Sequence, residues 1–159
     1  MDANQLNSFA NSGYRRLVVA GDVMKSPLLL AIRLYWGWQF FQTGLGKLGN
    51  LGKTSAFFNE LRIPFPAINA TLAGTVECVG GIFLILGLAS RLTALPLIIT
   101  MIVAYLTADL DAVKNVFSDS DSFVTAAPFL FLLAAVIVFA FGPGKFSIDH
   151  FLARKFRRI

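Results

Sequence analysis

The sequence predicts an all-α integral membrane protein, a four-helix bundle with both termini in the cytoplasm. Two observations lead to this prediction. Of the 159 residues, 56% are hydrophobic and 14% are charged, and four long apolar stretches follow one another along the chain. A soluble domain carries about a quarter charged residues, so this chain has too few to cover a water-exposed surface. The length leaves room for one compact unit.

Three parts are predicted along the chain. Residues 1–26 form a polar N-terminal segment that is either disordered or a short helix along the membrane surface. Residues 27–145 form the transmembrane domain, and residues 146–159 form a basic cytoplasmic tail. The apolar stretch after Arg15 and Arg16 is too short for a signal-peptide core, so the first membrane helix is expected to act as an uncleaved insertion signal.

Each of the four apolar stretches has about the 20 residues that a helix needs to cross the hydrocarbon core. The first stretch begins after Pro27, and proline suits the first turn of a helix. Pro96 and Pro128 lie inside the third and fourth stretches, where kinks are expected rather than breaks. The predicted membrane helices are 28–45, 67–89, 92–108 and 123–142.

The connections between these helices differ. Little more than Ser90–Arg91 joins the second and third helices, which predicts an antiparallel hairpin. The longer connection before residue 67 is expected to hold an interfacial helix that Thr54 caps, with Phe57, Phe58 and Leu61 on one side. A plain loop is the alternative there. The connection between the third and fourth helices is acidic.

Orientation follows from the basic residues. Nine of the fourteen Lys and Arg lie on the side of the two termini, four lie on the other side, and Arg33 lies within the first helix. The positive-inside tendency therefore places both termini in the cytoplasm. The nine are Arg15, Arg16, Lys25, Arg91, Lys145, Arg154, Lys155, Arg157 and Arg158. Arg91 and Lys145 are expected at the membrane boundary. Nucleic-acid binding is disfavoured, because these residues flank apolar runs and form no continuous basic face.

Glu77 is the main candidate for a functional residue. It lies near the middle of the second apolar stretch, where an unpaired carboxylate is costly. Small residues surround it and would let another helix approach closely, so Glu77 is expected to face the bundle. These small residues are Ala73, Gly74, Gly80 and Gly81.

The first helix is the expected neighbour of Glu77. One of its faces combines small residues with positive charge, and a second stripe on it is polar. The first face holds Arg33, Gly37, Phe40, Gly44 and Lys47, and the stripe holds Tyr35, Gln39 and Gln42. By depth, Glu77 is expected nearest to Gln39, with Arg33 closer to the cytoplasmic surface and Lys47 near the outer one.

Two interpretations of this cluster stay open. In one, Glu77, Arg33, Gln39 and Gln42 form a polar pocket that binds a quinone headgroup or relays protons. In the other, the same residues form a buried ion pair and hydrogen bonds that set helix register. No residue is predicted to be catalytic in this chain alone.

Metal and redox motifs are absent from the sequence. His150 is the only histidine, so two histidines of this chain cannot ligate a haem. Cys78 is the only cysteine, which excludes an internal disulfide, a C-x-x-C pair and a cysteine metal cluster. The acidic connection lacks a metal-ligand motif. No metal and no intrinsic cofactor are therefore expected.

Several stretches together resemble the DoxX family of small bacterial membrane proteins, over roughly residues 27 to 152. They are Arg33 leading into Phe41-Gln42-Thr43-Gly44-Leu45-Gly46-Lys47, then Pro64-Phe65-Pro66, Glu77-Cys78-Val79-Gly80-Gly81, Leu86-Gly87-Leu88-Ala89-Ser90-Arg91, and Phe141-Gly142-Pro143-Gly144-Lys145-Phe146-Ser147-Ile148-Asp149. The charged positions that recur in the family match Arg33, Lys47, Glu77 and Arg91 here.

The resemblance implies a four-helix bundle in the bacterial inner membrane that works beside redox partners, since relatives include the membrane subunit of a thiosulfate:quinone oxidoreductase. A quinone-class ligand would then be expected in the bundle. A non-catalytic accessory or assembly subunit of a larger membrane complex is the rival hypothesis. A small transporter, formed by two copies of the chain around Glu77, is a third, although no broken-helix pair supports it. The lipid bilayer, other membrane or redox subunits, and a second copy of the chain are the expected partners.

Overall fold

The computed structural model describes residues 3–156, and within this range the protein has helices and no strand. Residues 1 and 2 lie outside the described residues, as do Arg157 and Arg158 of the predicted basic tail. The helices are α1 (Ala3–Gly49), α2 (Leu51–Glu60), α3 (Pro66–Leu86), α4 (Ser90–Thr107), α5 (Leu110–Lys114), α6 (Ser120–Thr125), α7 (Pro128–Phe141) and α8 (Ile148–Phe156). The predicted all-α class is confirmed.

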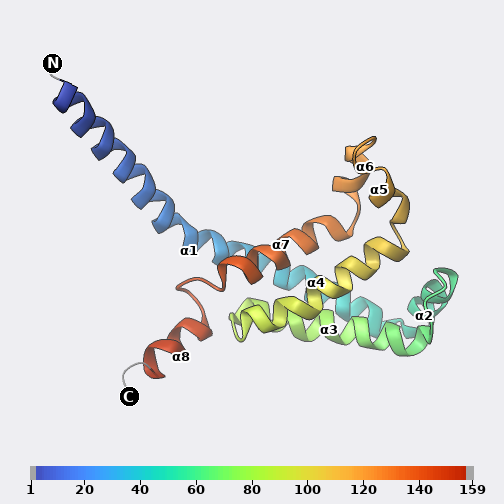
Figure 1. Ribbon diagram of the computed structural model, residues 1–159. Helices are drawn as coiled ribbons and strands as arrows, with labels where there is room; N and C mark the ends of the chain where they lie inside the picture. The colour runs from blue at the N-terminus through green and yellow to red at the C-terminus, as the bar shows by residue number, and fades with distance from the viewer. Residues whose placement is uncertain (1–2, 157–159) are drawn as a thin grey trace.

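Helix α1 is much longer than predicted. The first membrane helix was predicted to start after Pro27, but α1 runs from Ala3 to Gly49 with Pro27 inside it. Residues 3–26 are therefore helical and continuous with the packed part of α1, where a separate segment was predicted. A proline inside a helix removes one backbone donor and displaces one carbonyl, which a long helix survives as a bend. The N-terminal half of α1 projects away from the other helices (Figure 1).

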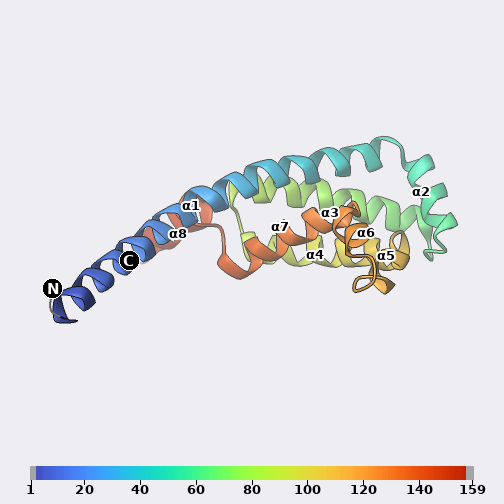
Figure 2. The same cartoon turned by 90° about the horizontal axis from the view of Figure 1, so that it is seen from above.

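The second half of α1 packs with α3, α4 and α7 around one core. Helix α3 contacts both α1 and α4, and α7 contacts both α4 and α1. From above, α1 lies along α3, and α7 lies along α4 (Figure 2). The buried core residues come from all four helices and are Phe40, Leu84, Leu97, Met101, Ala135 and Val138.

Two of the described helices, α3 and α4, are long and apolar enough to cross a membrane by length and composition. Their bounds, Pro66–Leu86 and Ser90–Thr107, agree with the predicted 67–89 and 92–108 to within a few residues. Helix α7 is also apolar but has only 14 residues. The polar N-terminal half of α1 sets that helix apart from α3 and α4.

Helix α7 starts later than predicted. The fourth helix was expected over 123–142 with a kink at Pro128, but the chain leaves the helical region at Ala126, where ψ is 138°. Pro128 then occupies the first turn of α7. This is the position where a missing backbone N–H costs nothing, so Pro128 begins a helix here and does not bend one.

Helix α2 confirms the expected short helix between the first two membrane stretches, but its predicted cap is wrong. The N-cap is Asn50, which makes no side-chain cap hydrogen bond. Thr54 lies one turn inside the helix, and its hydroxyl donates to the carbonyls of Lys47 and Asn50. Helices α2, α5 and α6 lie at the end of the bundle opposite the two termini (Figure 1).

Candidate functional site

The seam between α1 and α3 brings the two backbones unusually close. A Cβ atom on Gly44 would lie within 3 Å of the backbone of both Gly74 and Cys78. A Cβ atom on Gly37 would lie within 3 Å of the carbonyl oxygen of Gly81. Gly37 and Gly44, like Gly74 and Gly81, are seven residues apart, so the same small-residue stripe recurs two turns along each helix.

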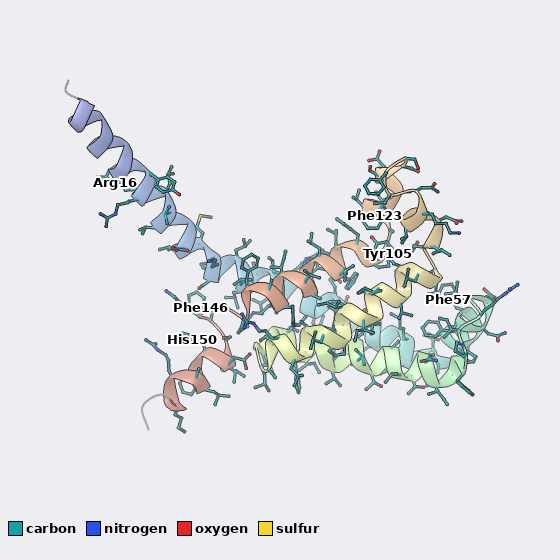
Figure 3. All side chains as sticks on the ribbon, viewed as in Figure 1. Arg16, Phe57, Tyr105, Phe123, Phe146 and His150 are labelled. Atoms are coloured by element: carbon teal, nitrogen blue, oxygen red, sulfur yellow. The ribbon has the colours of Figure 1, made fainter. Side chains whose placement is uncertain are left out.

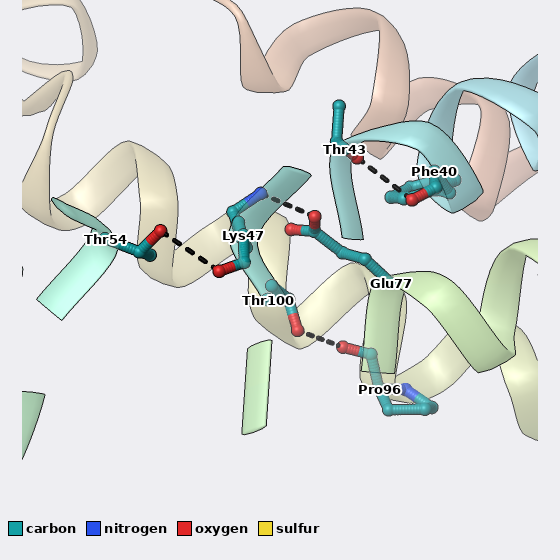
Figure 4. A network of polar contacts seen from close by, with 7 residues as sticks. All are labelled: Phe40, Thr43, Lys47, Thr54, Glu77, Pro96 and Thr100. Atoms are coloured by element: carbon teal, nitrogen blue, oxygen red, sulfur yellow. Dashed lines mark hydrogen bonds and ion pairs between the residues drawn. The ribbon is translucent and has the colours of Figure 1, made fainter. Parts of the chain in front are cut away.

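At the end of this seam, Lys47 of α1 forms an ion pair with Glu77 of α3 (Figure 4). The Lys47 Nζ atom donates to Glu77 Oε2 at 2.5 Å. The Glu77 side chain is 1% exposed, whereas the Lys47 side chain is 29% exposed. The Glu77 carboxylate is therefore buried inside the bundle, and the Lys47 ammonium group reaches it from the edge of the bundle.

A cavity of about 700 Å³ opens beside this pair, at the end of the bundle near α2. Both Lys47 and Glu77 line it. Its walls come from α1, α2, α3, α4 and α7 and are mainly apolar; they include Phe57, Phe58, Leu72, Met101 and Phe131.

Threonines also line the cavity, but their hydroxyl hydrogens are used within their own helices. Thr43 donates to the carbonyl of Phe40, and Thr100 donates to that of Pro96 (Figure 4). Besides the Lys47–Glu77 pair, a ligand in the cavity would therefore meet the polar side chains of Asn69 and Asp109, which also line it. The ammonium group of Lys47 has two further donors besides the one that Glu77 accepts.

Arg33 lies elsewhere, and the predicted cluster of Arg33 with Glu77 is wrong. Arg33 precedes Lys47 by fourteen residues on α1, a separation of about 21 Å along a helix. Its side chain is 1% exposed, and Nη2 donates to the carbonyl of Phe146 at 2.5 Å. The Nε and Nη1 atoms have no partner among the described residues.

Arg33 belongs to a second polar cluster, at the end of the bundle that carries the termini. There the Asp149 carboxylate accepts from the backbone N–H groups of Ala89 and Ser90 at 2.7 and 2.9 Å. Asp149 thereby caps the start of α4 from a residue at the start of α8. Its own N–H donates to the carbonyl of Gly87.

The Asp149 cap was not found from the sequence. The carboxylate and the backbone groups it caps are about sixty residues apart in the chain, and capping signals in a sequence are local.

The polar stripe Tyr35, Gln39 and Gln42 is directed away from Glu77. Tyr35 is 59% exposed, Gln42 is exposed, and Gln39 is half-buried. The Gln39 Nε2 atom lies 3.3 Å from the hydroxyl of Tyr35, one turn away on the same helix. Within the described chain, these three side chains take no part in lining the cavity beside Glu77.

The two residues expected at the membrane boundary lie at the end of the bundle that carries the termini. The Arg91 Nη2 atom donates to the carbonyl of Ala140 at the end of α7, at 3.3 Å. The backbone N–H of Lys145 donates to the Ser26 hydroxyl on α1 at 3.4 Å. In residues 3–156, no group of three or more His, Cys, Asp and Glu side chains is placed to hold a metal ion.

The region that matches a known family contains the Lys47–Glu77 pair and also Arg33, Ala89 and Ser90 of the second cluster, but not Phe146 and Asp149. The DoxX family model matches residues 28–110. An uncharacterized membrane protein of Mycobacterium tuberculosis is 30% identical over 138 residues, which cover 81% of this chain and 83% of that relative. An uncharacterized protein of Haemophilus influenzae is 29% identical over 134 residues, covering 79% and 83%.

A third relative, from Bacillus subtilis, bears the name "Putative oxidoreductase CatD". It is 31% identical over 83 residues, which cover 52% of this chain and 60% of that protein. No solved structure matches the chain significantly.

Proposed function

This chain belongs to the DoxX family of membrane proteins, and we propose that it is a multi-pass subunit of a membrane redox system that holds a quinone-class lipid beside Lys47 and Glu77. The cavity at this ion pair carries the proposal. The oxidoreductase name of the Bacillus subtilis relative supports the redox context.

The chemistry of the cavity suits a quinone. A quinone has a flat ring with carbonyl oxygens and a long apolar tail. The spare donors of Lys47 suit a ring carbonyl, and the aromatic and aliphatic walls suit the ring and the first part of the tail. The cavity volume of about 700 Å³ lies within the range of pockets that bury a small ligand.

The role of the protein would be to bind and orient the quinone, while a partner protein supplies or accepts the electrons. In the described chain, no metal-ligand cluster is present that could carry an electron. The partner is therefore expected to be another membrane or redox subunit.

We place the protein in the bacterial inner membrane as four crossings, made by the second half of α1 and by α3, α4 and α7. Both termini would be cytoplasmic. The N-terminal half of α1, which carries Arg15, Arg16 and Lys25, and the start of α4, which carries Arg91, lie toward one end of the bundle, as the positive-inside tendency requires. The acidic segment with α5 and α6 lies at the other end.

The test is the quinone content of the protein after purification from native membranes in nanodiscs, measured by solvent extraction and chromatography. We expect the wild-type protein to retain a quinone and the Glu77→Gln variant to lose most of it while staying folded. The matched control is Gln42→Ala, which changes the outward stripe of α1 and should keep the quinone. Retention by Glu77→Gln, or equal loss by both variants, would refute the site.

If the wild-type protein holds no quinone and copurifies only with large partner proteins, the accessory-subunit hypothesis replaces this one. Glu77 and Lys47 would then be packing residues that set the position of α1 against α3.

A further inference from the structure

The N-terminal arm, defined here as residues 13–25 of α1, leaves the bundle with all its side chains exposed. Several of these side chains are large and apolar: Tyr14 is 68% exposed, Leu17 73%, Val23 67% and Met24 68%. Figure 3 shows Arg16 on this projecting part of α1, far from the bundle. An apolar surface of this kind in a helix calls for a covering partner.

Exposed apolar side chains lie on more than one face of the arm, since Val19 and Val23 lie on the side opposite Leu17 and Met24. Tyr14, Leu17, Gly21 and Met24 follow one another at spacings of three or four residues and share one face. The Asp22 Oδ1 atom lies 3.6 Å from the Lys25 Nζ atom, so the carboxylate offsets the positive charge of Lys25. Among the side chains that the structure describes, Arg15 and Arg16 form no ion pair, and they lie on the other faces of the arm.

The junction between the arm and the bundle is sharply defined. Ser26 is 8% exposed and Leu29 is 4% exposed, because the segment at Gly144 and Lys145 packs against them. Pro27 lies at this junction and has no N–H to donate to the preceding turn. The packed part of α1 therefore starts where its hydrogen-bond ladder is weakest, and the arm has a bend point at its base.

We propose that the N-terminal arm binds the anionic lipid surface of the leaflet next to it, with the Tyr14–Leu17–Met24 face in the acyl boundary and Arg15 and Arg16 at the phosphates. The proposal rests on the proposed membrane topology, which puts the base of the arm at the bilayer surface. A helix with exposed apolar side chains and two arginines in this position is suited to an anionic interface.

Helix α8 is placed to contact the same lipid surface, because it leaves the bundle at the same end as the arm (Figures 1 and 2). Phe151 is 69% exposed on it, and its last turn carries Arg154 and Lys155. Two basic helices with exposed apolar side chains thus flank the end of the bundle that the charge count assigns to the cytoplasm.

A second copy of the chain fits this face less well than a lipid surface does. Parallel copies of the arm would bring the like-charged Arg15 and Arg16 pairs near one another, which is unfavourable. A lipid surface needs no interlocking side chains and attracts both arginines.

The test uses the full chain in nanodiscs, with Cys78→Ser and one spin label at Leu17→Cys or Val19→Cys. Leu17 and Val19 are both exposed, at 73% and 61%, but they lie on different faces of the arm. In nanodiscs with phosphatidylglycerol, we expect the label at 17 to be shielded from an aqueous nickel chelate and the label at 19 to stay accessible. Equal access at both positions would overturn the proposal. Spin–spin broadening between labels would identify a second copy as the partner instead.

Charge variants separate the lipid from other causes of shielding. Arg15→Gln with Arg16→Gln should lower the ratio of bound to free arm by about 25-fold, because each basic residue near an anionic surface contributes a factor of about five. Lys53→Gln, a matched change on the exposed surface of α2, should have no effect. Shielding that persists in the double variant or in phosphatidylcholine alone would also overturn the proposal. Quinone content measured in the same nanodiscs shows separately whether the cavity site stands or fails.

Discussion

At the scale of single residues, the Lys47–Glu77 pair joins two helices through partners with very different surroundings. Glu77 is almost completely buried, whereas Lys47 reaches the edge of the bundle on a flexible side chain. A lysine side chain is long enough to lie along an apolar surface and place its ammonium group at a polar boundary. The shorter side chain of a buried glutamate cannot do the same. The two partners should therefore not be equally replaceable.

This asymmetry predicts that Lys47→Met destabilises the protein more than Glu77→Gln does. Removing the cation leaves Glu77 buried without a counter-charge, at a cost of about 3–5 kcal/mol. Removing the carboxylate charge leaves a lysine that can turn outward, at a cost of about 1 kcal/mol for the lost hydrogen bond. Equilibrium unfolding in mixed micelles measures both variants. Equal losses would mean that Lys47 is as confined as Glu77.

The sequence predicted the face of α1 that meets α3 but not the level at which the residues meet. Spacing identified Gly37, Gly44 and Lys47 as one face, and the structure puts this face on the α3 seam. The depth estimate placed Glu77 at Gln39, since it compared positions within two apolar stretches whose offset is unknown. The contacts of Gly44 with Gly74 and Cys78 determine that offset, and they bring Glu77 to Lys47.

At the scale of the elements, the α1–α3 pair depends on glycines at a few points of closest approach. Gly44 packs directly against the α3 backbone, so a methyl group has no space there unless the helices separate. Gly46, two residues later on the same helix, has open space around the position of a Cβ atom. The two glycines share a helix and differ in their neighbours.

We expect Gly44→Ala to destabilise the protein by about 1–3 kcal/mol, the usual cost of an overpacked core, and to weaken the Lys47–Glu77 contact beside it. Gly46→Ala is the matched control and should stabilise α1 by about 0.5–1 kcal/mol, because alanine restricts the unfolded chain more than glycine does. Thermal unfolding in detergent distinguishes the two. A loss of stability for Gly46→Ala as large as for Gly44→Ala would mean that close packing against α3 is not the cause of the Gly44 effect.

Element boundaries show where local sequence signals are ambiguous. The bounds of the mainly apolar α3 and α4 were predicted to within a few residues, because their hydropathy is high over a whole membrane span. Proline signals were read the wrong way twice, because a proline both starts helices and bends them. Pro27 lies inside α1, where a helix start was predicted, and Pro128 starts α7, where a bend was predicted.

At the scale of the whole molecule, two polar clusters lie at opposite ends of one apolar bundle. The Lys47–Glu77 cavity lies at the end near α2, and the Arg33–Phe146 and Asp149 contacts tie the C-terminal segment to the end with the termini. A ligand in the cavity and a partner at the termini would thus contact the same four helices from opposite ends. The direction of the bundle in the membrane decides which compartment each cluster faces.

The number of membrane crossings depends on whether helix α7 spans the bilayer. Its 14 residues span about 21 Å at 1.5 Å per residue, less than the hydrocarbon core of about 30 Å. We nevertheless expect it to cross, because Val124 and Gly142 continue the apolar stretch on either side and because the bilayer thins around short segments. If it crosses, the acidic segment before it and α8 after it face opposite compartments.

Cysteine labelling in intact cells measures this directly, in a Cys78→Ser background. Phe117 in the acidic segment is 98% exposed and Phe151 on α8 is 69% exposed, so both positions accept a cysteine that reagents can reach. We expect a membrane-impermeant maleimide to label Phe117→Cys from outside the inner membrane and Phe151→Cys only after permeabilisation. Labelling of both from the same side would mean that α7 does not cross. The reverse pattern would place the quinone cavity at the cytoplasmic end and the basic termini outside, against the positive-inside tendency from which the orientation was inferred.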